Sequence, residues 1–122
     1  MLKPIILTIW MLLAPGAQRL PSASPIADAI VSATTDEREA ALLALYAWRE
    51  SSLRPEVTGD GGRSCGPWQM RCSAVRGLSL GAQARLWLSW VHASSLGSVD
   101  SSPARAAKRE RLAASLLERA KR

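Results

Sequence analysis

A stretch of glycines and prolines in the middle of the chain separates two helix-forming parts and limits the possible folds. Gly59, Gly61, Gly62 and Gly66 lie between two prolines, Pro55 and Pro67. Proline ends helices and glycine favours turns, so this segment predicts turns and a small hairpin. Leucine and alanine are abundant on both sides, and β-branched residues are few after residue 31, which favours helix over sheet. We therefore expect an α+β, mostly α fold.

The expected helices are located by their caps and by apolar residues that recur at helical spacing. Together they predict about four to five helices around a small hairpin or irregular glycine-rich segment. Thr34 and Glu37 have the spacing of a capping box. A short helix before them would point Ile26, Ile30 and Val31 inward. After the first segment, helices are expected to start at Pro25, at Thr34 and at Ser79, and Ser79 would cap a helix over residues 80–94. A last helix would start at Pro103, with Asp100 or a nearby serine as its cap.

The first seventeen residues have the pattern of a secretory signal. Lys3 supplies the positive charge, Ile5 to Ala14 form an uncharged apolar run, and small residues precede a cleavage position after Ala17. The run is shorter than the roughly 20 residues that a bilayer-spanning helix requires. We predict a cleaved signal peptide and a secreted or periplasmic protein. An uncleaved anchor and a buried N-terminal helix remain the alternatives.

Length and charge restrict the domain organisation and the partners. A chain of 122 residues allows one domain. We expect a signal peptide over residues 1–17, a linker over 18–24 and one domain over 25–122, whose last helix (103–122) is basic. The net charge of +6 suits an anionic partner such as a wall polymer, a membrane surface or a nucleic acid. The basic last helix is either a solvated face or a dock for an acidic polymer.

Two cysteines and one histidine are too few ligands for a typical zinc site. Cys65 and Cys72 are close and even in number, which predicts a disulfide in an oxidising compartment, with two free thiols as the alternative. They lack the second pair of ligands that a zinc site requires, and His92 has no partner histidine. We therefore expect no metal and no cofactor.

Glu50 is the leading candidate for acid chemistry. It follows Tyr46 by four residues, which puts it at the edge of the buried face of a helix that Pro55 brings to an end. A partly desolvated carboxyl there favours the protonated form that an acid catalyst needs. The alternative is a solvated carboxylate paired with Arg54 at the i+4 position.

The segment from Glu50 to Gln69 resembles the soluble lytic transglycosylases and goose-type lysozymes of the lysozyme-like superfamily. In those families a helix ends in Glu-Ser, a glycine-rich turn follows, and a G-x-x-Q motif comes next. Here Glu50-Ser51, Gly59–Gly62 and Gly66-Pro67-Trp68-Gln69 match these three parts. The resemblance implies a lysozyme-like fold and cleavage of the bond between N-acetylmuramic acid and N-acetylglucosamine in peptidoglycan.

The resemblance also implies roles for individual residues. Glu50 would act as general acid and then as general base, closing a 1,6-anhydro ring on the muramyl sugar. Ser51 would lie beside the acid, and Gly66 and Gln69 would bind the sugars. Trp68, in the turn-rich segment, is the candidate for stacking on a sugar ring.

Several features keep other interpretations open. Hydrolysis usually needs a second carboxylate, for which Asp60 is the main candidate and Glu56 the other. Goose-type enzymes can carry an aspartate just past the glutamine motif, where this chain has Arg71. The family's later Tyr motif has no counterpart, because no tyrosine follows Tyr46. The alternative is therefore a catalytically weak or inactive wall-binding protein.

The expected partner follows from this interpretation. It is the glycan strand of peptidoglycan, bound by a monomer, with membrane contact only through an uncleaved N-terminal segment. No nucleic-acid motif accompanies the positive charge, so no nucleic acid is expected as a partner. A basic helical protein that binds nucleic acid or membrane is the third hypothesis, and it would show strongly salt-dependent binding.

Overall fold

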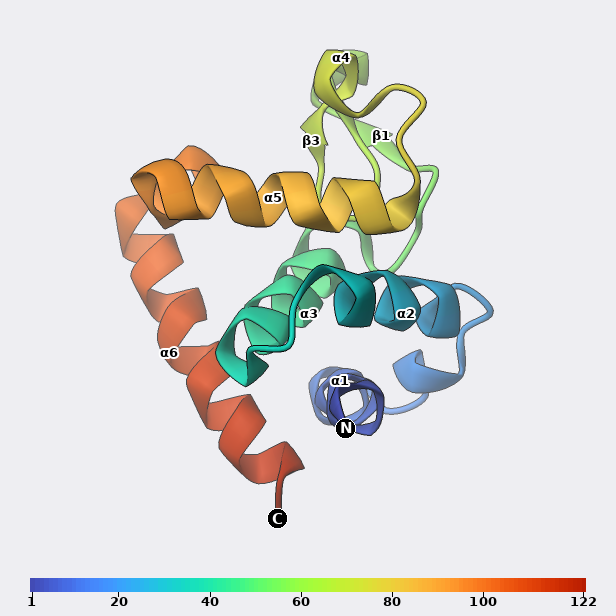
Figure 1. Cartoon of the computed structure of the whole chain (residues 1–122), viewed down its shortest axis with the longest axis vertical. Helices are drawn as coiled ribbons and strands as arrows, with labels where there is room; N and C mark the ends of the chain where they lie inside the picture. Colours follow the sequence, from blue (N-terminus) through green and yellow to red (C-terminus); the bar gives the residue numbers. More distant parts are fainter.

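Helices make up most of the computed structural model, which describes residues 1–122 (Figure 1). Three short strands form an antiparallel sheet in the order β1-β2-β3. The α+β, mostly α fold class is thereby confirmed. The helices are α1 (Leu2–Leu13), α2 (Ala23–Ala33), α3 (Glu37–Ser51), α4 (Cys72–Val75), α5 (Leu80–Ser94) and α6 (Pro103–Ala120). The strands are β1 (Thr58–Gly59), β2 (Ser64–Cys65) and β3 (Met70–Arg71), and single 3-10 turns are η1 (Ala17–Arg19), η2 (Asp60–Gly62) and η3 (Leu96–Ser98).

The sheet forms where the glycine-rich segment was expected to turn. Thr58 pairs with Cys65, and Cys65 pairs in turn with Met70. The connection between β1 and β2 contains Gly61 and Gly62 at φ values of 66° and 90°, a region that side chains disfavour. The predicted hairpin is confirmed, and a third strand extends it.

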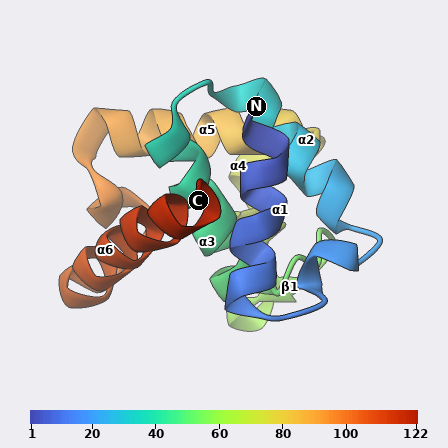
Figure 2. The same ribbon diagram turned by 90° about the horizontal axis from the view of Figure 1, so that it is seen from below.

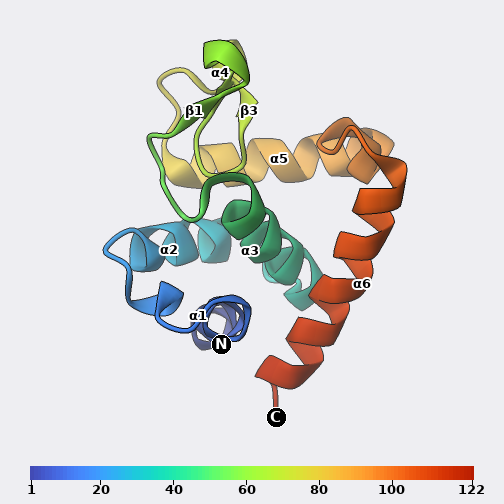
Figure 3. The same ribbon diagram turned by 180° about the vertical axis from the view of Figure 1, so that it is seen from behind.

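The central helix, α3, lies between α1, α2 and α6, and α5 crosses above it (Figures 1 and 3). Its N-cap is Asp36, whose side chain accepts a hydrogen bond from the Glu39 amide at 2.9 Å. The expected cap at Thr34 is wrong by two residues, because Thr34 instead accepts from the Asp36 amide. Ser52 and Leu53 end the helix with positive φ.

The other helix predictions are largely confirmed. α5 begins and ends as expected, and the Ser79 hydroxyl accepts from the Ala82 amide at its N-terminus. Ile26 and Ile30 of α2 are fully buried. Val31 is 39% exposed, so its predicted inward orientation is wrong: it lies one residue beyond the Ile26–Ile30 stripe, about 100° around the helix. The cap of α6 is Ser102, the nearby serine that was expected as the alternative to Asp100.

The first helix belongs to the core. Ile6, Ile9 and Trp10 are fully buried, and the Trp10 indole donates a hydrogen bond to the Ala44 carbonyl of α3 at 2.9 Å. From below, α1 lies in front of α3 and next to α2 (Figure 2), and it packs against α2, α3 and α6. In the structure of residues 1–122 this segment therefore has the conformation of the buried-helix alternative. Cleavage after Ala17 and export stay predictions.

The expected linker over 18–24 is also part of the packed structure. It contains the end of η1 and the beginning of α2, with Ala23 fully buried. The Ser22 hydroxyl donates a hydrogen bond to the Leu53 carbonyl, which ties this segment to the end of α3. No helix in the structure has both the length and the apolar character needed to cross a bilayer.

Candidate functional site

Glu50 lies in the last turn of α3, and 26% of its side chain is exposed. Its Oε2 accepts a hydrogen bond from Nη1 of Arg109 at 3.1 Å. Arg109 belongs to α6 and is itself only 13% exposed. Arg54, the partner at i+4 in the alternative interpretation, instead donates to the Ser51 carbonyl. Glu50 is therefore half-buried, as the helix pattern predicted, but its ion-pair partner comes from the other end of the chain.

A buried network supports the arginine that holds Glu50. The guanidinium of Arg109 lies 4.9 Å above the centre of the Tyr46 ring, a distance typical of cation–π contact. The Tyr46 hydroxyl donates to Asp100 Oδ2 at 2.8 Å, and Arg109 approaches the same oxygen at 3.8 Å. Arg105 donates to Asp100 Oδ1 from two nitrogens, at 2.6 and 2.9 Å. One carboxylate thus anchors a tyrosine and two arginines.

The surroundings change the acidity of two members of this network. Burial alone would raise the pKa of Asp100, but hydrogen bonds from Arg105, the Ser102 amide and Tyr46 outweigh it, and the net pKa lies below the ordinary 3.8. Burial, and then the hydrogen bond to Asp100, raise the pKa of Tyr46 well above its usual range. At neutral pH the pair therefore consists of an ionised Asp100 and a protonated Tyr46.

We expect Asp100→Asn to lower the free energy of unfolding by about 2 kcal/mol at neutral pH, because charge-assisted hydrogen bonds from Arg105 are weakened. The folded-state pKa of Asp100 is depressed, so its stabilisation is present above pH 3.8 and is lost as the pH falls through the folded pKa. Urea unfolding of the wild type and the variant at several pH values measures this difference. It should shrink in acid.

Asp28→Asn is the matched control, because Asp28 is largely exposed and pairs only with Lys3. This control should change the stability by less than about 1 kcal/mol. A difference between wild type and Asp100→Asn that stays constant from neutral pH to below pH 3.8 would contradict the assigned role of Asp100.

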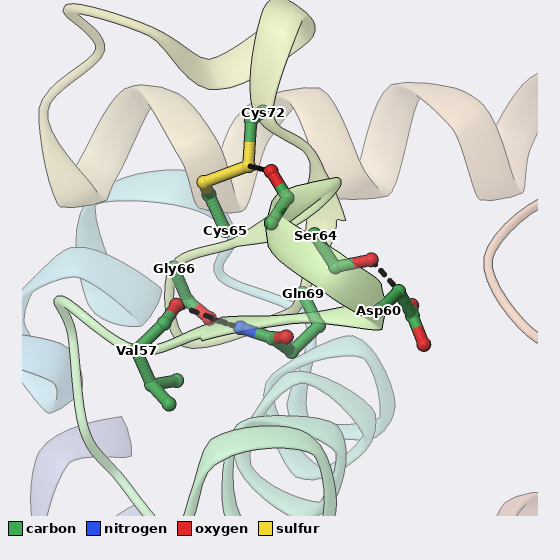
Figure 4. The surroundings of a disulfide bond; sticks show 8 residues. Val57, Asp60, Ser64, Cys65, Gly66, Gln69 and Cys72 are labelled. Carbon is green, nitrogen blue, oxygen red and sulfur yellow. Dashed lines mark hydrogen bonds between the residues drawn. A yellow bond between two sulfur atoms is a disulfide. The ribbon is translucent and has the colours of Figure 1, made fainter.

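Gln69 holds the glycine-rich segment together. Its Nε2 donates to the carbonyls of Val57 and Gly66, both at 2.9 Å (Figure 4). Its Oε1 lies against Gly59, where an added Cβ would come within 2.6 Å of it, so a side chain at this position would have to displace the Gln69 amide. Both donor hydrogens of the amide are therefore used inside the turn, and Gln69 and Glu50 make no hydrogen bond to each other.

Two residues expected to contact the substrate are core residues instead. Trp68 is 2% exposed, and its indole donates to the Leu43 carbonyl at 2.9 Å. The expected stacking of a sugar ring on Trp68 is wrong, because β3 and the turn before it fold this side chain onto α3. Ser51 is also 2% exposed and donates to the Ala47 carbonyl. It lies next to Glu50 in sequence, as expected, but its hydroxyl faces its own helix.

The other predicted residues of this region have structural roles. Asp60 is exposed and accepts a hydrogen bond from the Ser64 hydroxyl at 2.6 Å across the β1–β2 turn (Figure 4). Gly66 is buried, at φ 84°, beside the side chain of Gln83. The predicted disulfide between Cys65 and Cys72 is confirmed, and it joins β2 to the first residue of α4. His92 pairs with Glu39.

Two cavities border this region. One of about 480 Å³ lies beside the disulfide, between the loop after α3, α4 and the first turn of α5, and its lining includes Glu56, Gly66 and Gln83. A second, of about 310 Å³, lies between the end of α3 and α6. Its lining residues are Arg49, Arg105, Lys108, Arg109 and Leu112. Only the second is connected to Glu50, through Arg109. No three His, Cys, Asp or Glu side chains are arranged to hold a metal ion.

Sequence reasoning missed the residues around Glu50. Tyr46 and Glu50 are four residues apart on α3, and Arg105 and Arg109 are four apart on α6. Two such pairs, each on one helix face, are compatible with helices that meet along those faces. This i+4 spacing was the one indication in the sequence that each pair shares a helix face. That the two pairs contact each other follows only from the packing of α3 on α6.

A scan against protein-family models, a search of curated proteins and a search of solved structures found no match for this chain.

Proposed function

We propose that this protein cleaves the glycan strand of peptidoglycan between N-acetylmuramic acid and N-acetylglucosamine, with Glu50 as the acid. The observation that carries the proposal is the half-buried carboxyl of Glu50 at the end of α3. The chain leads from it directly into a small antiparallel sheet that carries the G-x-x-Q motif. This order of helix, acid, glycine-rich turn and glutamine supports a lysozyme-like glycosidase or lytic transglycosylase.

The chemistry needs one proton at a defined atom. Protonated Glu50 donates it to the oxygen that bridges the two sugars, and the bond from that oxygen to C1 of the muramyl sugar breaks. The carboxylate then accepts the proton of the C6 hydroxyl, whose oxygen bonds to C1 and closes the 1,6-anhydro ring. No water is consumed, and Glu50 ends in its starting form. Arg109 stabilises the carboxylate formed in between.

A single-acid route agrees with the residues near Glu50. Asp60, the main candidate for a second carboxylate, is engaged by Ser64 in the β1–β2 turn. The carboxylate that is close to Arg109 is Asp100, which is fully buried and accepts three side-chain hydrogen bonds. A buried carboxylate in that state has no access to activate water. Because Asp60 and Asp100 are both engaged, transglycosylation, which needs only one acid, suits this site better than hydrolysis does.

We further propose that the protein works outside the cytoplasmic membrane, where peptidoglycan lies. The disulfide between Cys65 and Cys72 is typical of an oxidising compartment. The apolar N-terminal segment, with Lys3 before it, supports recognition by the export machinery.

A second candidate is a protein that binds the cell wall without cutting it. It is favoured because three residues that were expected to bind the sugars form hydrogen bonds within the protein instead. Gln69 bonds to its own turn, and Trp68 and Ser51 bond to carbonyls of α3. In addition, Oε2 of Glu50 is occupied by the hydrogen bond from Arg109 rather than free to face a sugar.

Digestion of purified sacculi followed by mass spectrometry of the soluble fraction separates these candidates. The proposed function predicts muropeptides that are lighter by one water per cut than hydrolysis products, because an anhydro ring replaces the added water. Fully hydrated products would overturn the single-acid route. Co-sedimentation with sacculi and no soluble muropeptides would instead establish the binding protein.

A further inference from the structure

The cavity between α3 and α6 is lined almost entirely by positive charge. Four of its five lining residues are basic, namely Arg49 at the end of α3 and Arg105, Lys108 and Arg109 on α6, and the fifth is Leu112. Its volume of about 310 Å³ has room for a small charged group and its neighbouring atoms. Such a clustering of like charges raises the free energy of the empty cavity, which an anion would lower.

The positive charge of this cavity is only partly neutralised by the protein. Arg105 is paired with Asp100, and Arg109 contacts both Asp100 and Glu50. Arg49 and Lys108 are exposed and make no ion pair and no side-chain hydrogen bond. Two carboxylates therefore balance four cations, and two positive charges are left to face solvent from opposite walls of the cavity.

The cavity adjoins the proposed acid. Arg109 lines it and also donates to Oε2 of Glu50 at 3.1 Å, so one guanidinium separates the cavity from the carboxyl. A sugar bond held at Glu50 would bring the substituents of that sugar next to the cavity. In peptidoglycan the muramyl sugar carries a peptide stem, and the carboxylates of that stem are its anionic groups.

We infer that this cavity binds a carboxylate of the peptide stem, with Arg49 and Lys108 as its main contacts and Arg109 as the link to Glu50. The inference rests on the proposed function, since it names the form of glycan that the site prefers. Arg109 contacts both the cavity and Oε2 of Glu50, so an anion bound there would hold its sugar close to the acid. The preferred substrate is therefore a strand that still carries its stems.

The test compares intact sacculi that lack teichoic acid with the same glycan after an amidase has removed the stems. The wild type should form new anhydro ends, counted by mass spectrometry, about tenfold faster on the stem-bearing material, and this ratio should fall towards one in Arg49→Gln/Lys108→Gln. Arg111→Gln/Arg119→Gln is the matched control, because it removes the same charge from exposed positions outside the cavity. It should keep the wild-type ratio. An unchanged ratio in the Arg49/Lys108 variant would overturn the inference.

A binding measurement keeps the two proposals separable. The soluble stem tripeptide alanyl-glutamyl-diaminopimelate is titrated into each protein and followed by NMR, at low and at high salt. Binding that weakens with salt and is lost in Arg49→Gln/Lys108→Gln supports the anion site even if no sacculus is cut, in which case the proposed function fails alone. Cleavage of both substrates at equal rates, without tripeptide binding, would overturn the anion site and leave the proposed function standing.

Discussion

Trp10→Ala is expected to lower the free energy of unfolding by about 3–5 kcal/mol, a large part of the 5–15 kcal/mol that holds a typical domain together. The Trp10 ring is fully buried between α1 and the central helix, and its indole donates to the Ala44 carbonyl. The substitution leaves a cavity and also removes the donor from a buried carbonyl. Urea unfolding followed by circular dichroism measures the loss.

Met11→Ala is the control, because Met11 is the next residue of α1 and is 40% exposed. It should shift the unfolding midpoint little. A second comparison uses a chain that begins at Gln18, which removes all of α1 together with Ile6 and Ile9. This shortened chain should be strongly destabilised if α1 is part of the working protein. A shortened chain as stable as the full one would contradict the core role of α1 and would favour the cleaved signal peptide.

The two interpretations of the N-terminal segment have a common physical cause. An apolar run preceded by one lysine is the pattern that the export machinery recognises. The same apolar side chains can pack into a hydrophobic groove between helices. The groove consists of side chains from α2, α3 and α6, and α3 and α6 are far from α1 in the sequence. Hydrophobic spacing within residues 2–13 therefore could not distinguish a leader from a core helix.

Elements set by neighbouring residues could be predicted. Ser79 and the apolar stripe that follows it correctly predicted the bounds of α5. The glycines before Gly66 correctly predicted the hairpin. The seven-residue separation of Cys65 and Cys72 gave the disulfide. The cap of α3 was misassigned because Thr34 and Asp36 both offer a suitable oxygen, and the two-residue difference depends on how the chain leaves α2.

The surroundings of Glu50 depend on contacts between distant segments, and these were not predictable. Its half-buried position follows from the helix period of α3, but its partner Arg109 comes from α6. Trp68 illustrates the converse case. A tryptophan among turn residues is expected to be exposed and able to stack on a sugar ring. Instead, the fold of the sheet buries it, and its indole donates to the Leu43 carbonyl of α3. Both outcomes are decided by how α6 and the sheet pack on α3.

Glu50→Gln should reduce the release of soluble fragments from sacculi by about 10³-fold, because an amide cannot donate the proton that the leaving sugar oxygen needs. The variant should remain folded, since the amide oxygen can still accept the hydrogen bond from Arg109. Glu110→Gln is the matched control: Glu110 is exposed on α6 and makes no ion pair. Its rate should equal that of the wild type.

The acid role of Glu50 is tested by the rate at which purified sacculi release soluble muropeptides, measured side by side for the wild type, Glu50→Gln and Glu110→Gln. Release is expected from the wild type and Glu110→Gln, with almost none from Glu50→Gln at an unchanged unfolding midpoint. Equal release by all three proteins would contradict that role.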